Sequence, residues 1–401
     1  MPGSLTRPAS RIAQGAMTSL LALLLVLAIH PPARAGDTPT TTDPALAAAG
    51  WIAQQVETDP TLGVGSLADA IFAFAATGTG QTAAATALAG IETNIDAYVA
   101  PGGITAPGQM AKVMLAVQVQ GADPTAFGGH DLEAELRAVL IDTGPDAGRF
   151  GTASVFDQAM VILALARTSG GAPASAVTWL SGAQCPSGEY SFDGSCPAGP
   201  GAEDPDTTAI ALQALLAGGA STDAGEAVSW LLAIQQSDGG LPSFGIANTN
   251  SSGVAAQALR AAGETASADA ATTFVTSLAF GCDADPAEIG AIGWAVGIPG
   301  FLIFSTPQAV LAFGSPPLDQ LTAAGADEEA PVLDCATAGP APTVSPTASL
   351  APATPVPSGD AGELPDTSTG PAGPHPWVPI AALLVSAVAA RIAVRRRRAV
   401  S

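Results

Sequence analysis

The chain repeats one helical unit, and this repeat constrains its fold more than any other feature. Between residues 51 and 314, an Ala-rich segment, a loop rich in Gly, Pro and Asp, and a shorter Ala/Leu segment ending in Gly recur six times. The closing glycines lie roughly 43 to 51 residues apart, a period typical of repeat architectures. The six closing segments span residues 68–78, 110–121, 157–170, 208–219, 254–263 and 306–314. Each unit is expected to be an αα-hairpin that stacks on its neighbours, because alone it buries too little apolar surface.

Two of the six units share a specific motif. In both, Trp-Leu is followed four residues later by Gln and then by a Gly-containing loop that ends in Ser-Phe. The matched residues are Trp179, Leu180, Gln184, Ser191 and Phe192 in one unit, and Trp230, Leu231, Gln235, Ser243 and Phe244 in the next. Runs of β-branched residues with period two are nearly absent, so an all-α fold is predicted. Asp69, Asp157 and Asp206 are expected near the starts of closing helices as caps.

The motifs of these units resemble the α/α-toroid superfamily of prenyltransferase and squalene-oxidase repeats. That superfamily includes class II terpenoid cyclases, protein prenyltransferase β-subunits and the helical domain of cobalamin carriers. The resemblance lies in Trp230-Leu231 with Gln235, Asp238-Gly239-Gly240 and Phe244, and in Asp204-x-Asp206-Thr207-Thr208-Ala209 with Leu212, Ala214 and Leu215 behind it. It implies an all-α, α6/α6 toroid over residues 44–336, since six hairpins close such a ring in these families.

The segment from Asp204 to Ala209 is the one motif with possible chemistry. Class II terpenoid cyclases use an Asp-x-Asp-Asp-Thr-Ala motif whose central Asp protonates an alkene, and matching by residue places that acid at Asp206. Thr207 stands where those enzymes have the next Asp, the chain is poor in aromatic residues, and their second helical domain is missing. The competing interpretation is that Asp206 caps a helix while Asp204 decorates the preceding loop.

The start of the chain resembles a secretory signal peptide. Arg7 and Arg11 precede an apolar run over residues 17–29, and Ala33-Arg34-Ala35 forms a small-residue cleavage site. Residues 1–35 are therefore expected to be a signal peptide. An uncleaved anchor is the alternative, but the apolar run is short for a membrane span.

The end of the chain has the organisation of a surface anchor. Residues 337–376, rich in Pro, Thr, Ser and Ala, are expected to form an extended stalk. Residues 377–394 are apolar apart from Arg391, and the tail 395–401 carries four arginines, which predicts a transmembrane helix with a cytoplasmic tail. The stalk sequence Leu-Pro-Asp-Thr-Ser-Thr-Gly at residues 364–370 resembles the LPxTG sorting signal, but Ser368 follows Thr367. A retained membrane anchor is favoured, with sortase attachment to the cell wall as the alternative.

The four cysteines are expected to form disulfides, as in an exported protein. They permit three connectivities, and proximity in sequence favours Cys185 with Cys196 and Cys282 with Cys335. His130 is the single histidine between the signal and the stalk, so the zinc site of prenyltransferase β-subunits is not expected. No metal or other cofactor is predicted.

The charge of the chain is strongly acidic. All 35 carboxylates lie outside the signal and the tail. Between the signal and the predicted transmembrane helix the basic residues are Lys112, Arg137, Arg149, Arg167 and Arg260. Such a balance argues against binding nucleic acid, and it is typical of a solvated, self-repelling surface; attraction to cations or basic partners is the sharper alternative.

Two functions remain on the sequence. The first is an exported, membrane-anchored, monomeric cell-surface protein whose toroid binds a small molecule, glycan or protein in its cavity or on its rim without catalysis. The second is a terpenoid-cyclase-like enzyme with Asp206 as general acid. In both cases Asp204 and Asp206 mark the expected site.

Overall fold

The computed structural model describes residues 38–196 and 203–336. The predicted signal peptide, stalk, transmembrane helix and basic tail fall outside these residues. Within the described ranges, none of the helices combines the length and apolar character that a membrane span requires.

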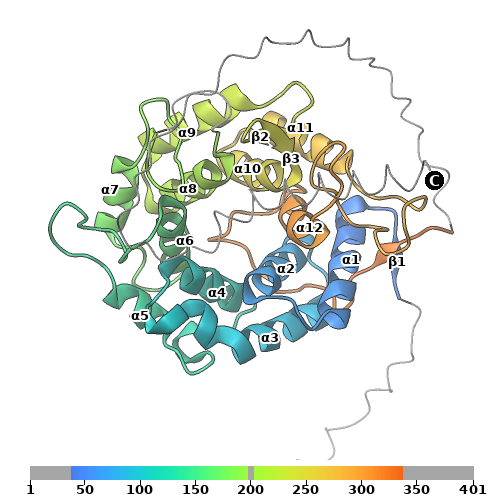
Figure 1. Cartoon of the computed structure of the whole chain (residues 1–401), viewed down its shortest axis with the longest axis horizontal. Coiled ribbons are helices and arrows are strands. Elements are labelled where there is room, and N and C mark those ends of the chain that lie inside the picture. The colour runs from blue at the N-terminus through green and yellow to red at the C-terminus, as the bar shows by residue number, and fades with distance from the viewer. Residues whose placement is uncertain (1–37, 197–202, 337–401) are drawn as a thin grey trace, which may run out of the picture. The chain divides into compact units, whose positions relative to one another are not determined.

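Twelve α-helices in the described residues form two concentric layers (Figure 1). The outer helices are α1 (Pro44–Thr58), α3 (Gln81–Val99), α5 (Leu132–Ala138), α7 (Ala174–Gly182), α9 (Ser221–Ile234) and α11 (Thr265–Thr276). The inner helices are α2 (Val64–Thr77), α4 (Pro107–Val119), α6 (Val155–Ala166), α8 (Pro205–Gly218), α10 (Thr249–Ala261) and α12 (Leu302–Val310). Each inner helix packs against the next, and α12 packs against α2, so the inner layer closes into a ring.

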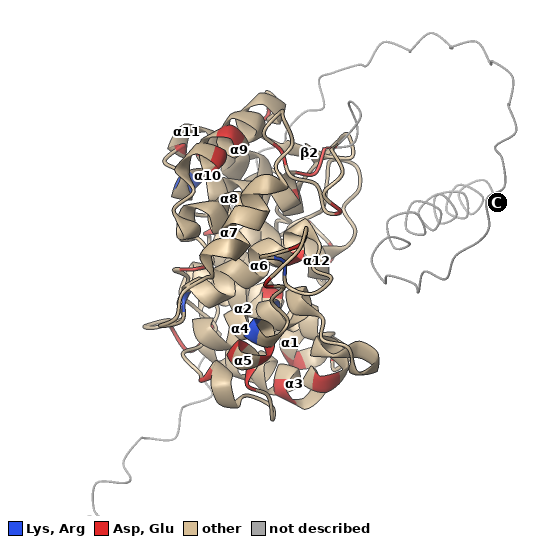
Figure 2. Ribbon diagram, turned by 90° about the vertical axis from the view of Figure 1, so that its left-hand side faces the viewer, with Lys and Arg blue, Asp and Glu red and all other residues tan. Residues whose placement is uncertain are grey.

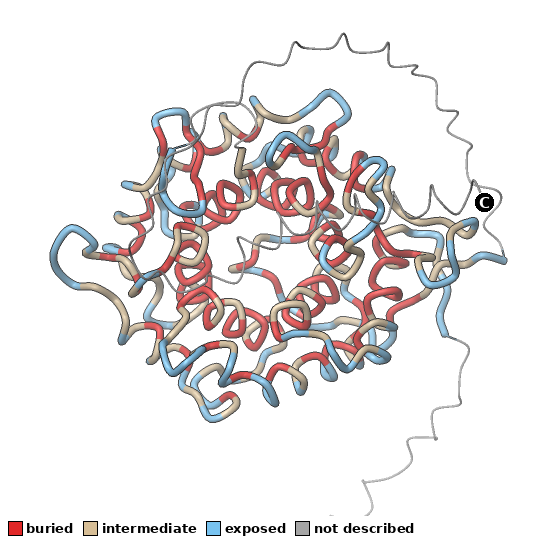
Figure 3. The backbone as a smooth tube through the Cα atoms, viewed as in Figure 1, coloured by how far each residue is buried: buried red, intermediate tan, exposed pale blue. Residues whose placement is uncertain are grey.

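The two layers bury their residues differently (Figure 3). The inner helices are buried around most of their circumference; in α6, for example, nine of twelve residues are buried. Alanine is frequent among the buried residues, which permits close approach of neighbouring helices. The outer helices bury one stripe, as Ala224, Ala227 and Leu231 of α9 show. The hydrophobic core therefore lies around and between the inner helices.

The inner helices are the six closing segments of the repeat, and they begin two to five residues earlier than predicted. In α6, α8 and α10 the difference comes from capping residues that precede the Ala/Leu pattern. Ser154 caps α6 in a capping box with Asp157, and Asn248 caps α10 by accepting a hydrogen bond from the backbone N–H of Ser251.

The helix predicted to end at Gly170 ends four residues earlier, at Ala166, and Arg167 at its C-cap keeps a right-handed conformation. Gly171, and not Gly170, takes the left-handed conformation, with φ 62°. Gly170 lies close to Arg137: a Cβ there would lie 2.7 Å from the guanidinium, which donates a hydrogen bond to the carbonyl of Gly171 and would have to shift.

Two small strand pairs depart from a purely helical fold. Strand β1 (Thr40–Thr41) pairs in parallel with β4 (Val332–Leu333), which joins the two ends of the described chain. Strands β2 (Leu241–Ser243) and β3 (Ile246–Asn248) form an antiparallel hairpin between α9 and α10. Both pairs are too short to have shown a period-two pattern in the sequence.

The disulfides follow the connectivity that sequence proximity favours. Cys185 pairs with Cys196 across the loop that leads to α8, and Cys282 pairs with Cys335 across residues that include α12. The second bond ties the end of the described chain to the last hairpin of the ring.

The Gln of the Trp-Leu repeat motif has the same structural role in both units. The side-chain amide of Gln184 donates to the carbonyls of Gly188 and Asp223, at 2.8 and 2.9 Å. That of Gln235 donates to the carbonyls of Gly239 and Ser267, at 3.0 and 2.9 Å. Each Gln thus fixes its own loop to the beginning of the next outer helix, so this part of the motif holds the fold together.

Candidate functional site

All six inner helices begin at the same face of the ring, which we call the entry face. Neighbouring inner helices are joined in pairs by residues of their first two turns: Asp69 of α2 with Lys112 of α4, Asp206 of α8 with Ser251 of α10, and Asn250 of α10 with Phe304 of α12. The start of α6 is joined to the start of α8 through Phe192, whose carbonyl accepts from Val155 and whose N–H donates to Asp204. The loops that lead from outer to inner helices therefore all gather at the entry face.

Asp204 is the N-cap of α8. One carboxylate oxygen accepts the backbone N–H of Thr207 at 3.0 Å, and the other accepts the backbone N–H of Phe192 at 2.9 Å. Burial raises the pKa of Asp204, and these hydrogen bonds from backbone N–H groups act in the opposite direction. Asp204 thus starts the helix and holds the preceding loop against it.

Asp206 is the second residue of α8 and is not its N-cap. Its carboxylate is half-buried, and the hydroxyl of Ser251, on the next inner helix, donates to Oδ2 at 2.7 Å. Burial, followed by the nearby charge of Asp204, raises the pKa of Asp206 to about 6. The predicted roles of the two residues are therefore reversed: Asp204 is the cap, and Asp206 is the carboxylate without a capping role. Pro205 explains the reversal, because proline favours the first helical position and makes the residue before it the N-cap.

Thr208, in the same motif, holds a loop in place. Its hydroxyl accepts the backbone N–H of Tyr190 at 3.0 Å. Equivalent residues near the starts of other inner helices do the same: Gln158 accepts from Phe150, and Ser252 from Leu241. Thr208 is therefore a repeated structural element of the ring, and Asp206 stands out because no such role accounts for it.

A second charged group on the entry face was missed in the sequence. Lys112 of α4 forms an ion pair with Asp69 of α2 at 2.8 Å. Asp69 is the sixth residue of α2, so the prediction that it caps this helix is wrong. Burial acts to lower the pKa of Lys112, but attraction to Asp69 and Tyr98 outweighs burial and raises it. Asp69 and Lys112 lie 43 positions apart, so no local sequence signal predicts their pairing. The available hint was that they carry opposite charges at equivalent positions of two inner helices.

Most of the large exposed apolar side chains of the described residues lie on the entry face. Phe244, in the turn between β2 and β3, is 71% exposed, and Phe192 is 46% exposed. Val296, in the loop before α12, and Phe304, in its first turn, are 73% and 53% exposed. The remaining members are Ile104 and Ile246 on this face and Leu216 near the other end of α8. Such a concentration of exposed apolar groups marks a surface for interaction.

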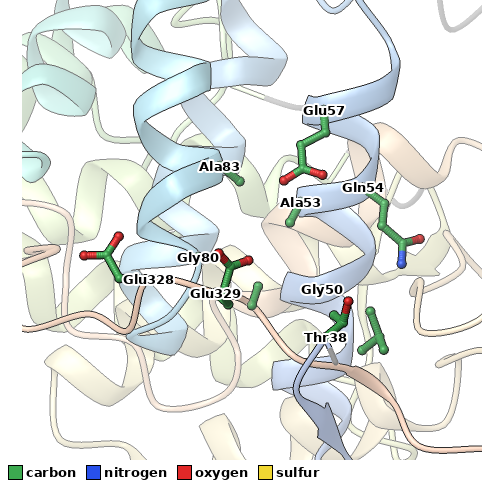
Figure 4. Close-up of a pocket in the computed structure, with 11 residues that line it drawn as sticks. Thr38, Gly50, Ala53, Gln54, Glu57, Gly80, Ala83, Glu328 and Glu329 are labelled. Atoms are coloured by element: carbon green, nitrogen blue, oxygen red, sulfur yellow. The ribbon is translucent and has the colours of Figure 1, made fainter. Parts of the chain in front are cut away.

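Two small, partly open pockets, each of about 120 Å³, lie away from Asp204 and Asp206. One is lined by residues of α1 and α3 together with the chain before β4, and Figure 4 shows Glu57 and Glu329 beside it. The other lies between α1 and the loop after α11. Neither brings together the motif residues, so the entry-face side chains remain the candidate site.

No group of three His, Cys, Asp or Glu residues in the described part of the chain is arranged to hold a metal ion. His130 is held between two carboxylates, with Nε2 2.9 Å from Asp96 and Nδ1 3.0 Å from Glu135. Its hydrogen bond to Asp96 is the main cause that raises its pKa. These contacts join α3 to α5 and are structural.

Few basic residues accompany the acidic ones along the chain (Figure 2). Between residues 168 and 336 the single basic residue is Arg260, near the end of α10 and so away from the entry face. There it binds the carbonyl of Ala312 and the carboxylate of Asp269, at 3.0 and 2.8 Å. The acidic groups on the half of the entry face formed by α8, α10 and α12 therefore have no basic neighbour from residues 168–336, the part of the chain that forms this half.

Comparison with known proteins gives distant likenesses in structure alone. No family model matches the sequence, and a search of curated proteins gives no match. Among solved structures, the chain is similar to ent-copalyl diphosphate synthase from Streptomyces platensis, with a TM-score of 0.44 and 20% sequence identity. The match covers 62% of this chain and 49% of that one, so the chain spans about half the length of the protein it resembles.

Proposed function

We propose that the chain is an exported, membrane-anchored surface protein whose helical ring is a non-catalytic binding module, with its ligand site on the entry face at the starts of α8, α10 and α12. In this proposal residues 1–35 direct export, and residues 377–394 anchor the chain through the stalk 337–376. The two disulfides support an oxidising exterior, since such bonds persist mainly outside the reducing cytosol.

The observation that carries the proposal is the placement of Asp206, a half-buried carboxylate bonded to Ser251 of the next inner helix and close to the exposed rings of Phe192 and Phe244. The raised pKa of Asp206 means that the folded state disfavours its charge, because burial removes water from it. Asp204 and Thr208, in the same motif, have structural roles, whereas Asp206 contributes no cap and no loop contact. A carboxylate kept where it destabilises the fold is typical of a functional site.

The surroundings of Asp206 favour binding over catalysis. Two aromatic residues at the start of α8, Phe192 and Phe244, are exposed and form an open surface, whereas Tyr190, held there by Thr208, is buried in the core. Chemistry on carbocations requires an enclosed site from which water is excluded.

The alternative is a terpenoid-cyclase-like enzyme in which Asp206 is the general acid. One observation favours it: the raised pKa of Asp206 keeps a larger fraction of this carboxyl protonated near neutral pH than an ordinary Asp retains. Formation of a cyclic product from an isoprenoid diphosphate, lost in Asp206→Asn, would establish this alternative and overturn the binding proposal.

Native mass spectrometry of the full chain purified from its source tests the binding function. We expect a ligand to accompany the wild-type chain and to be depleted in Phe244→Asn, which removes an exposed ring. Asn tolerates the positive φ of 49° at this position, so the backbone is preserved. Leu216→Ser, on an exposed apolar residue near the other end of α8, is the matched control and should retain the ligand. A chain without any bound species, or equal occupancy in all three proteins, would contradict the proposal.

A further inference from the structure

Five exposed apolar side chains form an arc along the starts of α8, α10 and α12. We call this set the apolar arc: Phe192, Phe244, Ile246, Val296 and Phe304. The backbone N–H of Phe192 donates to Asp204, and that of Phe244 donates to the carbonyl of Glu203 at 3.3 Å, so both rings emerge beside the start of α8. The two residues are also equivalent in the repeat, each following Ser in the loop before an inner helix.

The arc continues from the β2–β3 turn to α12. The side-chain amide of Asn250, at the second position of α10, donates to the carbonyl of Phe304 at 2.9 Å. The backbone N–H of Thr249 donates to the carbonyl of Trp294 at 2.8 Å, which fixes the loop that bears Val296 to the same helix start. The arc is therefore held on the ring by hydrogen bonds rather than suspended on free loops.

Phe244 combines high exposure with an unfavourable backbone conformation. It is 71% exposed, and its φ of 49° lies in the left-handed region, which costs about 1–2 kcal/mol for a residue with a Cβ. Glycine follows it at position 245, and the turn keeps phenylalanine at 244 nonetheless. Both the exposure and the conformation disfavour phenylalanine in the free protein, so the ring is expected to gain contacts in a complex.

Charge selects the occupant of the arc. The carboxylates of Asp193, Asp204 and Asp206 lie near Phe192 and the start of α8. Asp193 accepts hydrogen bonds from Ser195 that lower its pKa and keep it ionised. The charge of Asp193 acts on Asp204, and that of Asp204 acts on Asp206, so the three form one acidic stretch. A second copy of this chain would bring the same acidic arc, and repulsion disfavours it. A cation fits, because aromatic faces and carboxylates both attract Arg and Lys side chains.

We propose that the apolar arc docks a partner protein through a segment that carries Arg or Lys beside apolar side chains. This inference rests on the proposed binding function and names the partner class. The apolar side chains of such a segment contact Phe192, Phe244 and Phe304. Its cationic groups reach Asp206 and compensate the charge of this carboxylate, which has no basic neighbour from the units of α8, α10 and α12.

Fluorescence anisotropy tests the inference on the full chain in nanodiscs of zwitterionic lipid. The probe is a labelled synthetic peptide of alternating Arg and Leu; peptides of alternating Glu and Leu, and of alternating Arg and Ser, are the comparisons. We expect the Arg–Leu peptide to bind more tightly than either comparison, because only this peptide satisfies both the charge and the apolar surface. Equal binding of the Glu–Leu peptide, or of the Arg–Ser peptide, would overturn the inference.

Variants locate the binding surface. Phe244→Asn and Asp206→Asn should each lower the affinity for the Arg–Leu peptide by about tenfold, equivalent to roughly 1.4 kcal/mol. Ile104→Ser, on an equally exposed residue of the entry face outside the arc, and Leu216→Ser should leave the affinity unchanged. An unchanged affinity in Phe244→Asn, in protein whose melting temperature matches the wild type, would contradict the assignment. Phe192→Ser supplies an independent second test if Phe244→Asn fails to fold.

The remaining outcomes separate this inference from the proposed function. If the peptide binds only after the four arginines at 395–398 are replaced by serine, the arc is filled by the chain's own tail and the partner inference is wrong. If the Arg–Leu peptide does not bind, but a non-peptide ligand accompanies the wild-type chain and is lost in Phe244→Asn, the binding function stands and this inference is wrong. If neither binds, both are wrong.

Discussion

The hydroxyl of Ser251 donates a hydrogen bond of 2.7 Å to the carboxylate of Asp206, across the boundary between two inner helices. This contact joins the starts of α8 and α10, and it only partly offsets the loss of water around the carboxylate, because the pKa of Asp206 remains raised. The chain thus retains a negative charge at a position where its own fold disfavours that charge.

Asp206→Asn should therefore stabilise the protein at pH 7. The amide oxygen of Asn still accepts the Ser251 hydroxyl, and the variant has no buried charge. A rise of the pKa from 3.8 to about 6 corresponds to a gain of about 1–3 kcal/mol in the free energy of unfolding. Chemical denaturation of wild type and variant measures the difference.

The pH dependence of this difference follows from the sign of the shift. The folded chain binds the Asp206 proton more tightly than the unfolded chain, so the wild type loses stability relative to the variant as pH rises from about 4 to about 6. Below about pH 4 the carboxyl is protonated in both states and the two proteins should converge, whereas above about pH 7 the difference should be constant. A difference that grew toward acid would mean that the pKa of Asp206 is depressed.

Gln235→Ala should destabilise the ring through the loop that Gln235 fixes. The variant loses two hydrogen bonds and leaves the carbonyls of Gly239 and Ser267 without this donor, at a cost of about 1–3 kcal/mol. Gln236→Ala, at the exposed neighbouring position, is the control and should change the free energy of unfolding by less than about 0.5 kcal/mol. Similar effects of the two substitutions would argue against the structural role of the motif.

Two glycines should respond to alanine in opposite directions. Gly239 has φ 91°, and a Cβ there would lie 2.1 Å from the carbonyl oxygen of Ala270, so Gly239→Ala should cost about 2 kcal/mol or more. Gly225 lies inside α9 with no atom within 4 Å of an added Cβ, so Gly225→Ala should raise stability by about 0.5–1 kcal/mol. Thermal melting of the two variants gives both signs, and a stabilised Gly239→Ala protein would refute the packing described for this loop.

The disulfides should differ in their contribution to stability. Cys282 and Cys335 are separated by 53 positions, and Cys185 and Cys196 by 11. In the chain-entropy model the longer loop contributes about 4 kcal/mol and the shorter about 3 kcal/mol. Replacing each pair by serine and measuring denaturant midpoints tests the order; a larger loss from the 185–196 pair would contradict it.

The repeat predicted most of the ring, because six apolar segments ending in glycine define six hairpins whatever their exact caps. Helix starts were misplaced where capping residues precede the apolar pattern, as at Ser154 and Asn248. The exchange of roles between Asp204 and Asp206 could have been avoided, since Asp-Pro at a helix start already marks Asp204 as the N-cap. The distant pairs could not be predicted, because Asp69 with Lys112 and Asp206 with Ser251 depend on which inner helices are neighbours.

The apolar arc was also beyond sequence reasoning. Phenylalanine is usually a core residue, and the repeated Ser-Phe at Phe192 and Phe244 indicated only that their loops are equivalent. Their exposure is decided by the hydrogen bonds that hold each loop to the start of α8, through Asp204 and Glu203. Tertiary contacts, and not local pattern, turn these rings outward.

The measurement that tests the central claim most directly is ligand occupancy of Asp206→Asn, determined by native mass spectrometry on the full chain purified beside the wild type. The account predicts that the variant is the more stable protein and yet carries less ligand, since it lacks the charge that the site retains at a cost to folding. Full occupancy of Asp206→Asn by the species bound to the wild type would contradict the assignment of the entry face as the binding site.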